Sequence, residues 1–123
     1  MIEIMPSPAN VVAFRVADVV TAEDYGAVIP AIEKKLNEHR DIGILADLTR
    51  FKDMTVGALG RDLQYGLSKL GEVHRFKRAA VISDKQWIKA ATDLTGAFFP
   101  QIEARVFAEH EKSEAMEWAA GVQ

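Results

Sequence analysis

Short apolar runs alternate with helical patterns along almost the whole chain, and this alternation constrains the fold more than any other feature. Two strand-like runs come first, and helix and strand patterns then follow each other to the last residues. Such alternation is typical of α/β domains, in which helical crossovers join parallel strands. We therefore expect a mixed, mostly parallel five-stranded sheet with about four helices, in the order β-β-α-β-α-β-α-β-α.

Five apolar runs are the expected strands. Turn residues and prolines separate the first two runs, which favours an antiparallel hairpin. The central runs are almost continuously apolar, as strands buried on both faces of a parallel sheet are. The expected strands are residues 2–5, 11–16, 42–46, 79–82 and 102–107.

Four further segments carry apolar residues at helical spacing. Thr21 is a natural N-cap for the first of them, and Ser83 or Asp84 opens the third. Pro30 lies inside the first segment, so we expect a kink there or a helix that restarts. The expected helices fall within residues 21–40, 56–70, 83–94 and 115–119.

The composition is that of one soluble domain. The chain has 123 residues, and 49% of them are hydrophobic, which is enough for a core. A net charge of −3 gives no electrostatic reason to expect nucleic acid as a partner. The sequence has no cysteine, which excludes disulfides, thiolate metal sites and cysteine nucleophiles. We expect a single domain over residues 1–123.

The N-terminal residues lack the basic segment and the long apolar run of a signal peptide. No apolar stretch approaches the roughly 18 residues that a membrane span needs. We therefore expect a cytoplasmic protein without a membrane span.

The sequence also lacks the residue patterns of common active sites. Its histidines, His39, His74 and His110, are not spaced as metal ligands on one helix face. No glycine-rich phosphate loop follows a strand, and no serine has the context of a nucleophile elbow. We expect no metal site, no cofactor and no enzymatic activity. An acid–base pair of Asp47 and Asp53 is the weakest hypothesis, since nothing in the sequence brings the two carboxyls together.

The segment from Asp47 to Thr55 is the most informative candidate surface. It follows a central strand and precedes a helix, and ligands of open α/β sheets gather at the carboxyl ends of strands. Thr55 is a natural N-cap, which exposed backbone amides would follow. The alternative is structural: Asp47 and Thr49 satisfy the backbone of a turn, and Thr55 only caps the helix.

Trp87 lies near the carboxyl end of the next strand along the chain. It could line an apolar pocket with Phe51 and Met54, and packing in the core is the alternative role. The candidate residues for binding a ligand or partner are therefore Asp47, Thr49, Phe51, Thr55 and Trp87.

Five short segments together have a family likeness. They are TAEDY (21–25), IPAIE (29–33), ADLTRF (46–51), SDKQW (83–87) and ARVF (104–107). These segments resemble the SpoIIAA-like family of STAS/SEC14-type domains, and the resemblance extends over nearly the whole chain. It implies the β-α superhelix that STAS domains share with the lipid-exchange CRAL-TRIO domains. It also places the chain near a largely uncharacterised group of bacterial proteins.

The resemblance further implies a candidate modification site. The STAS anti-sigma-factor antagonists carry a phosphorylated serine in an Asp-Ser-Ser/Thr-Gly-Leu segment at a helix start. The matching region here, DMTVGAL (53–59), keeps Asp53 and Gly57, but its spacing is longer by one residue and the serine is missing. Thr55 is the one hydroxyl in this region and hence the candidate for phosphorylation.

Two functions are consistent with these patterns. The first is a non-enzymatic binding or regulatory module that acts through protein–protein contacts around the candidate residues. The alternative is a carrier of a small apolar or lipid-like ligand, in the manner of SEC14/CRAL-TRIO domains. A homodimer is also compatible with the sequence, since most soluble oligomers are symmetric. The alternative rests on residues near the strand ends, namely Phe51, Met54, Trp87, Phe98 and Phe99.

Overall fold

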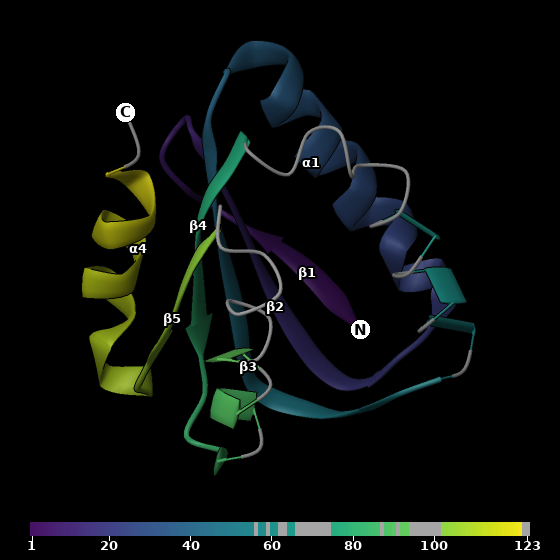
Figure 1. Cartoon of the computed structure of the whole chain (residues 1–123). Helices are drawn as coiled ribbons and strands as arrows, with labels where there is room; N and C mark the ends of the chain where they lie inside the picture. The colour runs from purple at the N-terminus through teal and green to yellow at the C-terminus, as the bar shows by residue number, and fades with distance from the viewer. Residues whose placement is uncertain are drawn as a thin grey trace.

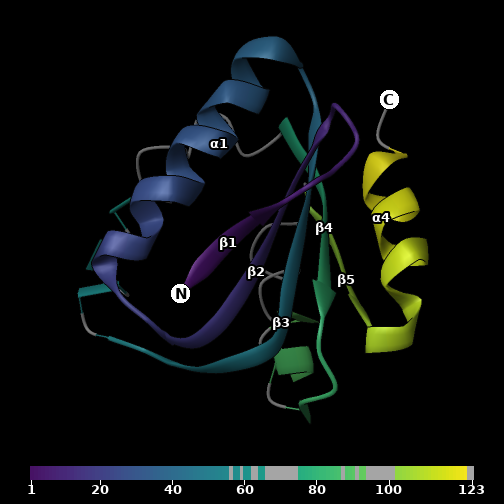
Figure 2. The same ribbon diagram turned by 180° about the vertical axis from the view of Figure 1, so that it is seen from behind.

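A mixed sheet of five strands forms the centre of this computed structural model, which describes residues 1–55, 57–58, 60–61, 64–65, 75–86, 88–90, 92–93 and 102–121. In chain order the strands are β1 (Ile2–Met5), β2 (Val11–Val20), β3 (Ile42–Met54), β4 (Phe76–Ile82) and β5 (Glu103–Phe107). Two α-helices are described over their full lengths, α1 (Tyr25–Glu38) and α4 (Lys112–Ala120). Helix α1 lies on one face of the sheet and α4 on the other (Figure 1), as the view from behind also shows (Figure 2).

The strands are ordered in the sheet as they are in the chain. β1 runs antiparallel to β2, and Met5 lies opposite Ala13. The pairs β2–β3, β3–β4 and β4–β5 are parallel. The predicted hairpin and the predicted mixed, mostly parallel five-stranded sheet are therefore confirmed.

The helices agree with the sequence prediction in part. α1 and α4 are present, and residues 57–58, 60–61, 64–65, 86, 88–90 and 92–93 are helical as well. The expected second and third helices thus lie partly outside the described residues, and these residues do not establish a count of about four. None of the described helices is both long and apolar enough to cross a membrane.

α1 runs through Pro30 as one helix, so the expected restart does not occur. Its buried side chains, Val28, Ile32 and Leu36, lie on both sides of the proline along the helix. Packing of such an apolar face supplies most of a helix's stability in a protein, and here it outweighs the backbone hydrogen bond that proline removes.

β3 is longer than predicted. The sequence predicted a strand over residues 42–46 and then a loop, but β3 continues to Met54. β2 continues beside it to Val20, past two irregularities in the pairing, one between Arg15 and Ala17 and one between Asp18 and Val19. Asp18 takes a positive φ of 55°. The expected loop from Asp47 onwards is therefore wrong, because β3 still pairs with β2 beyond the first irregularity, at Arg50, Phe51, Asp53 and Met54.

The sheet buries a core on each face, because side chains along a strand alternate between the two faces. On the α4 side, the core consists of Val11, Ala13, Leu45, Ala80, Ile82, Phe107, Ala115 and Ala119. On the α1 side, it consists of Val12, Ile32, Leu36, Ile42 and Phe76.

Helix α4 lies unusually close to the sheet at Gly43. A Cβ atom at this position would overlap the backbone carbonyl of Ala119. The buried side chain of Asn10 donates a hydrogen bond from Nδ2 to the carbonyl oxygen of Ala120 (2.9 Å). Gly43 provides the room and Asn10 the polar contact that hold the C-terminal end of α4 against the sheet.

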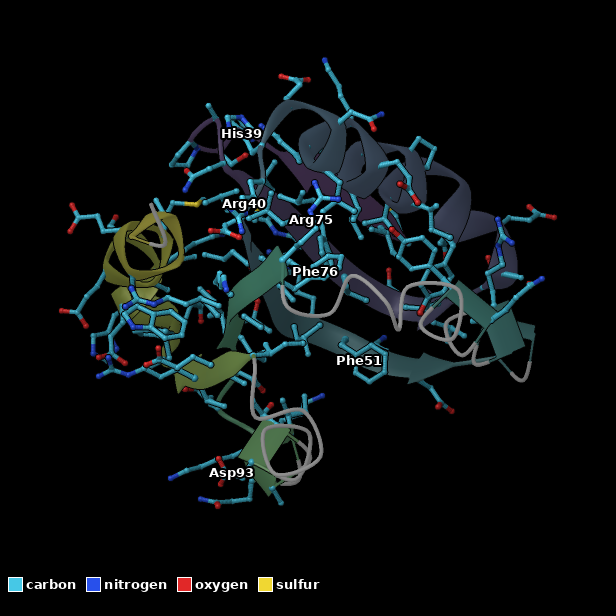
Figure 3. The ribbon with its side chains drawn as sticks, turned by 45° about the horizontal axis from the view of Figure 1, so that its top comes forward. His39, Arg40, Phe51, Arg75, Phe76 and Asp93 are labelled. Atoms are coloured by element: carbon cyan, nitrogen blue, oxygen red, sulfur yellow. The ribbon has the colours of Figure 1, made fainter. Side chains whose placement is uncertain are left out.

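Arg75 holds the C-terminal end of α1 in a similar way. Its guanidinium donates hydrogen bonds to the carbonyl oxygens of Leu36, His39 and Arg40, the last two at 2.9 Å. Figure 3 shows Arg75, just before β4, beside His39 and Arg40. A cation at this end also interacts favourably with the helix dipole.

We predict that Gly43→Ala lowers the free energy of unfolding by about 1–3 kcal/mol, because α4 must move away from the sheet to admit the methyl group. Chemical denaturation measures this change. Gly26→Ala is the matched control, since a Cβ atom at this helical position meets nothing within 4 Å. The control should raise stability by about 0.5–1 kcal/mol. Equal effects of the two substitutions would contradict the close packing at Gly43.

Candidate functional site

Asp47 of β3 is a buried carboxylate, with 3% of the residue exposed. Its Oδ1 accepts hydrogen bonds from the backbone amide of Thr49 (3.1 Å) and from the Thr49 hydroxyl (2.6 Å). Its Oδ2 accepts one from Nζ of Lys112 at the start of α4 (2.9 Å) and lies 3.5 Å from Nε of Arg15 on β2. We call Arg15, Asp47, Thr49 and Lys112 the Asp47 network.

The network holds Asp47 in its charged form. Burial on its own raises the pKa of this carboxyl, but the hydrogen bonds from Thr49 and Lys112 outweigh burial and lower the pKa from 3.8 to about 2. The carboxylate is therefore ionised at neutral pH and has no proton to donate in general acid catalysis.

The network joins three elements at one point of the sheet. Asp47 lies opposite Arg15 on one side and Ile82, the last residue of β4, on the other. The side chains of Arg15 and Lys112 are each 35% exposed, so both cations reach from the buried carboxylate towards solvent. The arrangement positions the first turn of α4 over the sheet, which corresponds to the structural role considered for Asp47 and Thr49.

The sequence reasoning missed the two cations. Arg15 interrupts an apolar strand, a pattern that by itself indicates only a partly exposed face. Lys112 lies in the first turn of α4, where a cation is unfavourable next to the positive end of the helix dipole. This unfavourable position is the one sequence feature that could have indicated that Lys112 pairs with an acid elsewhere in the chain.

Thr55 caps the helical segment that follows it. Its Oγ1 accepts a hydrogen bond from the backbone amide of Ala58 (3.0 Å), and its own amide donates to the carbonyl oxygen of Val20 (2.9 Å). The predicted N-cap is therefore confirmed. Phosphorylation of this half-buried hydroxyl stays a prediction.

The candidate residues do not form one surface. Asp47 and Thr49 belong to the face of the sheet that α4 covers. Phe51 instead packs with Val16 and Ala58 on the face that α1 covers (Figure 3). Trp87 and the side chain of Met54 lie outside the described residues, so the expected apolar pocket is not tested.

The suggested pair of Asp47 and Asp53 is not formed. Both lie on β3, six residues apart, and a strand rises about 3.3 Å per residue, which separates them by roughly 20 Å. Asp53 is exposed, whereas Asp47 is buried. Within the described part of the chain, no group of three or more His, Asp or Glu side chains is arranged to hold a metal ion.

The part of the sheet beyond the Asp47 network presents polar groups to solvent. We call residues 17–20 of β2 and 48–54 of β3 the β2–β3 extension. Nζ of Lys52 lies 3.7 Å from Asp18, and Nζ of Lys85 donates to the carbonyl oxygen of Phe51 (2.7 Å). Val19 is 48% exposed. The other exposed residues of the extension are Asp18, Arg50, Lys52 and Asp53.

Comparisons with known proteins agree with this fold. The sequence profile of the SpoIIAA-like family matches residues 11–120. A similar solved structure is that of an uncharacterized DUF3478-family protein with a SpoIIAA-like fold from Shewanella loihica PV-4. The two chains are 29% identical with a TM-score of 0.76, over 98% of this chain and 93% of that chain. No curated protein matches the chain. The family resemblance seen in the sequence is thereby confirmed.

We predict that Asp47→Asn removes part of the acid dependence of stability. The pKa of Asp47 is about 2 in the folded chain and near 3.8 ordinarily, so its ionisation stabilises the fold above pH 4 and this contribution disappears as the pH falls towards 2. A difference of nearly two pKa units corresponds to about 2 kcal/mol. The free energies of unfolding of wild type and variant, from urea titrations between pH 2 and 7, should therefore converge at low pH.

Thr49→Val tests the stabilisation of the Asp47 carboxylate by removing one of its hydrogen-bond donors. It removes the hydroxyl donor but keeps the amide donor, so its loss of stability at neutral pH should be smaller than that of Asp47→Asn. Parallel stability curves for wild type and Asp47→Asn down to pH 2 would contradict the lowered pKa.

Proposed function

We propose that this chain, which belongs to the SpoIIAA-like family, is a non-enzymatic binding module that contacts a protein partner through the β2–β3 extension. One observation carries the proposal. The pairing of β3 with β4 ends at Asp47 and Ile82, while β3 continues for seven residues and, among the described strands, pairs there only with β2. The sheet thus has a two-stranded projection in which Ala17 and Val20 are buried, while five other side chains face solvent, namely Asp18, Val19, Arg50, Lys52 and Asp53.

The projecting edge suits recognition of another chain. Among the described residues, no strand pairs with β3 beyond Asp47 on the β4 side, and an edge of this kind presents amide and carbonyl groups that an extended peptide can bind. Lys85 satisfies the carbonyl of Phe51, which anchors the middle of the extension. Arg50, Lys52 and Asp53 add charged side chains of both signs, which can select a partner by electrostatic complementarity.

The base of the extension is firmly held, which also supports a binding role. The Asp47 network ties β2, β3 and α4 together where the extension begins. The backbone of Thr55 bonds to Val20 where it ends. A surface that is fixed at both ends loses little conformational entropy on binding.

A regulatory module without catalysis accords with the chemistry of Asp47. Its oxygens are engaged by Thr49, Lys112 and Arg15, and it stays ionised at neutral pH. The absence of cysteine from the sequence is compatible with work in a reducing compartment, and we propose the bacterial cytoplasm.

The alternative, carriage of a small apolar ligand, has less support. Of the five side chains suggested to line its pocket, only Phe51 is described. Phe51 packs with Val16, Val20 and Ala58. Native mass spectrometry of protein purified from its own cells tests this alternative, and a bound apolar molecule that survives desalting would favour the carrier over the binding module.

We predict that the double variant Arg50→Glu/Lys52→Glu loses a partner that wild type retains, because two charges on the extension are reversed. Affinity purification from the source organism, with quantitative mass spectrometry, measures the recovery of each protein. Lys34→Glu/Lys89→Glu is the matched control, since it reverses two exposed lysines outside the extension. At least one protein should fall roughly tenfold or more in recovery with the first variant and be unchanged with the control.

Equal recovery of every retained protein with both double variants would overturn the assignment of the extension as the contact surface. Circular dichroism of both variants should match that of wild type, so that a loss of binding is not a loss of fold.

A further inference from the structure

β5 is the edge strand of the sheet on the side away from β1. The amide of Ser83, just after β4, donates to the carbonyl oxygen of Phe107 (3.1 Å). Backbone groups of successive residues point to opposite edges of a strand, so Arg105 and Phe107 direct theirs to β4. Ala104 and Val106 direct theirs outwards, and no described strand pairs with them.

The side chains of β5 form a self-complementary pattern around Ala104. Glu103 precedes Ala104 and Arg105 follows it, and both charged residues are exposed. The half-buried apolar residues Ile102 and Val106 flank these charges. When the strand is reversed about Ala104, Glu103 and Arg105 exchange places, and so do Ile102 and Val106.

We propose that a second copy of this chain pairs with β5 antiparallel, with the twofold axis at Ala104, and extends the sheet across a homodimer. The outward backbone groups of Ala104 then bond to those of the partner's Ala104. Glu103 lies opposite the partner's Arg105, and Arg105 lies opposite the partner's Glu103. Opposite charges in directly facing positions stabilise an antiparallel pair.

The same charges select this register over its neighbours. Only shifts of two residues keep the outward backbone groups facing each other. A shift in one direction places Glu103 opposite the partner's Glu103, and a shift in the other places Arg105 opposite the partner's Arg105. Like charges in facing positions are destabilising, so one register is favoured.

The α4 face leaves room for the second copy. α4 packs mainly on β3 and β4, so the twofold-related helix lies about four strand spacings away, or roughly 19 Å. This exceeds the roughly 10 Å diameter of a helix. Arg105 lies over the rings of Phe107 (5.1 Å) and Trp118 (6.0 Å), and Glu103 lies 3.6 Å from Arg78. Because Phe107 belongs to the core that α4 covers, Arg105 and Glu103 lie on that same face of β5.

Sedimentation velocity at low salt, over a range of protein concentrations, tests the proposal. Wild type should sediment as a dimer at the upper concentrations. Glu103→Arg places two arginines opposite two arginines, and Arg105→Glu places two glutamates opposite two glutamates. Each single variant should dimerise roughly tenfold or more weakly than wild type.

An equimolar mixture of the two single variants gives the decisive result. In the mixed pair, every arginine of one chain faces a glutamate of the other, so a heterodimer should form at concentrations where each variant alone is monomeric. The double variant Glu103→Arg/Arg105→Glu should dimerise like wild type. Circular dichroism controls for folding, and the variant with Arg50→Glu and Lys52→Glu should remain dimeric, because it alters a different edge.

Ala104→Pro tests the backbone contact separately. The amide of Ala104 points away from β4, so proline removes no bond within the sheet but blocks pairing at the edge. A folded, monomeric variant supports the proposal. Wild type that stays monomeric at the highest concentration would overturn it, and so would a wild-type dimer that Glu103→Arg and Ala104→Pro leave intact.

Discussion

The ionised carboxylate of Asp47 is buried where the pairing of β3 with β4 ends, and its burial determines which groups must surround it. Removing a charge from water costs several kcal/mol unless the charge is paired and hydrogen-bonded. The pairing of Asp47 with Lys112 and Arg15, and its hydrogen bonds with Thr49, meet this demand. Because Lys112 begins α4, the same interaction fixes where that helix starts. The start of α4 over the sheet is thus fixed by the electrostatics of one residue on β3.

Polar contacts hold the other helix ends as well. Asn10 and Gly43 fix the far end of α4, and Arg75 fixes the C-terminal end of α1. At the beginning of α1, the amide of Thr21 donates to the carboxylate of Asp24 (2.7 Å). Apolar packing supplies most of the stability of the two cores, while these polar contacts decide the position of each helix along the sheet.

Local patterns predicted the fold well, because the period of apolar residues depends on neighbours in the chain. The order of the strands along the chain, the hairpin and the cap at Thr55 all follow from residues close together in sequence. The length of β3 could not be predicted in this way. Its second half carries charges at Arg50 and Lys52, and it is kept extended by pairing with β2.

The candidate site was less predictable. Lys112 is 65 residues from Asp47, and no spacing in the sequence reveals that the two meet. β3 has an extra residue relative to β2 at each irregularity in their pairing, and Phe51 packs on the face of the sheet opposite Asp47. Proximity in the chain therefore suggested a single surface where the structure has two.

The contact between Asn10 and Ala120 joins residues 110 apart in the chain, and this has a consequence during synthesis. α4 covers one whole core, including Val11, Leu45 and Ile82. A ribosome must release residue 120 before that face can close, so these apolar side chains stay uncovered while most of the sheet already exists. Nascent chains with such exposed surface are prone to aggregate, and chaperones bind them. The emergence of α4 is thus the step that ends this vulnerable interval.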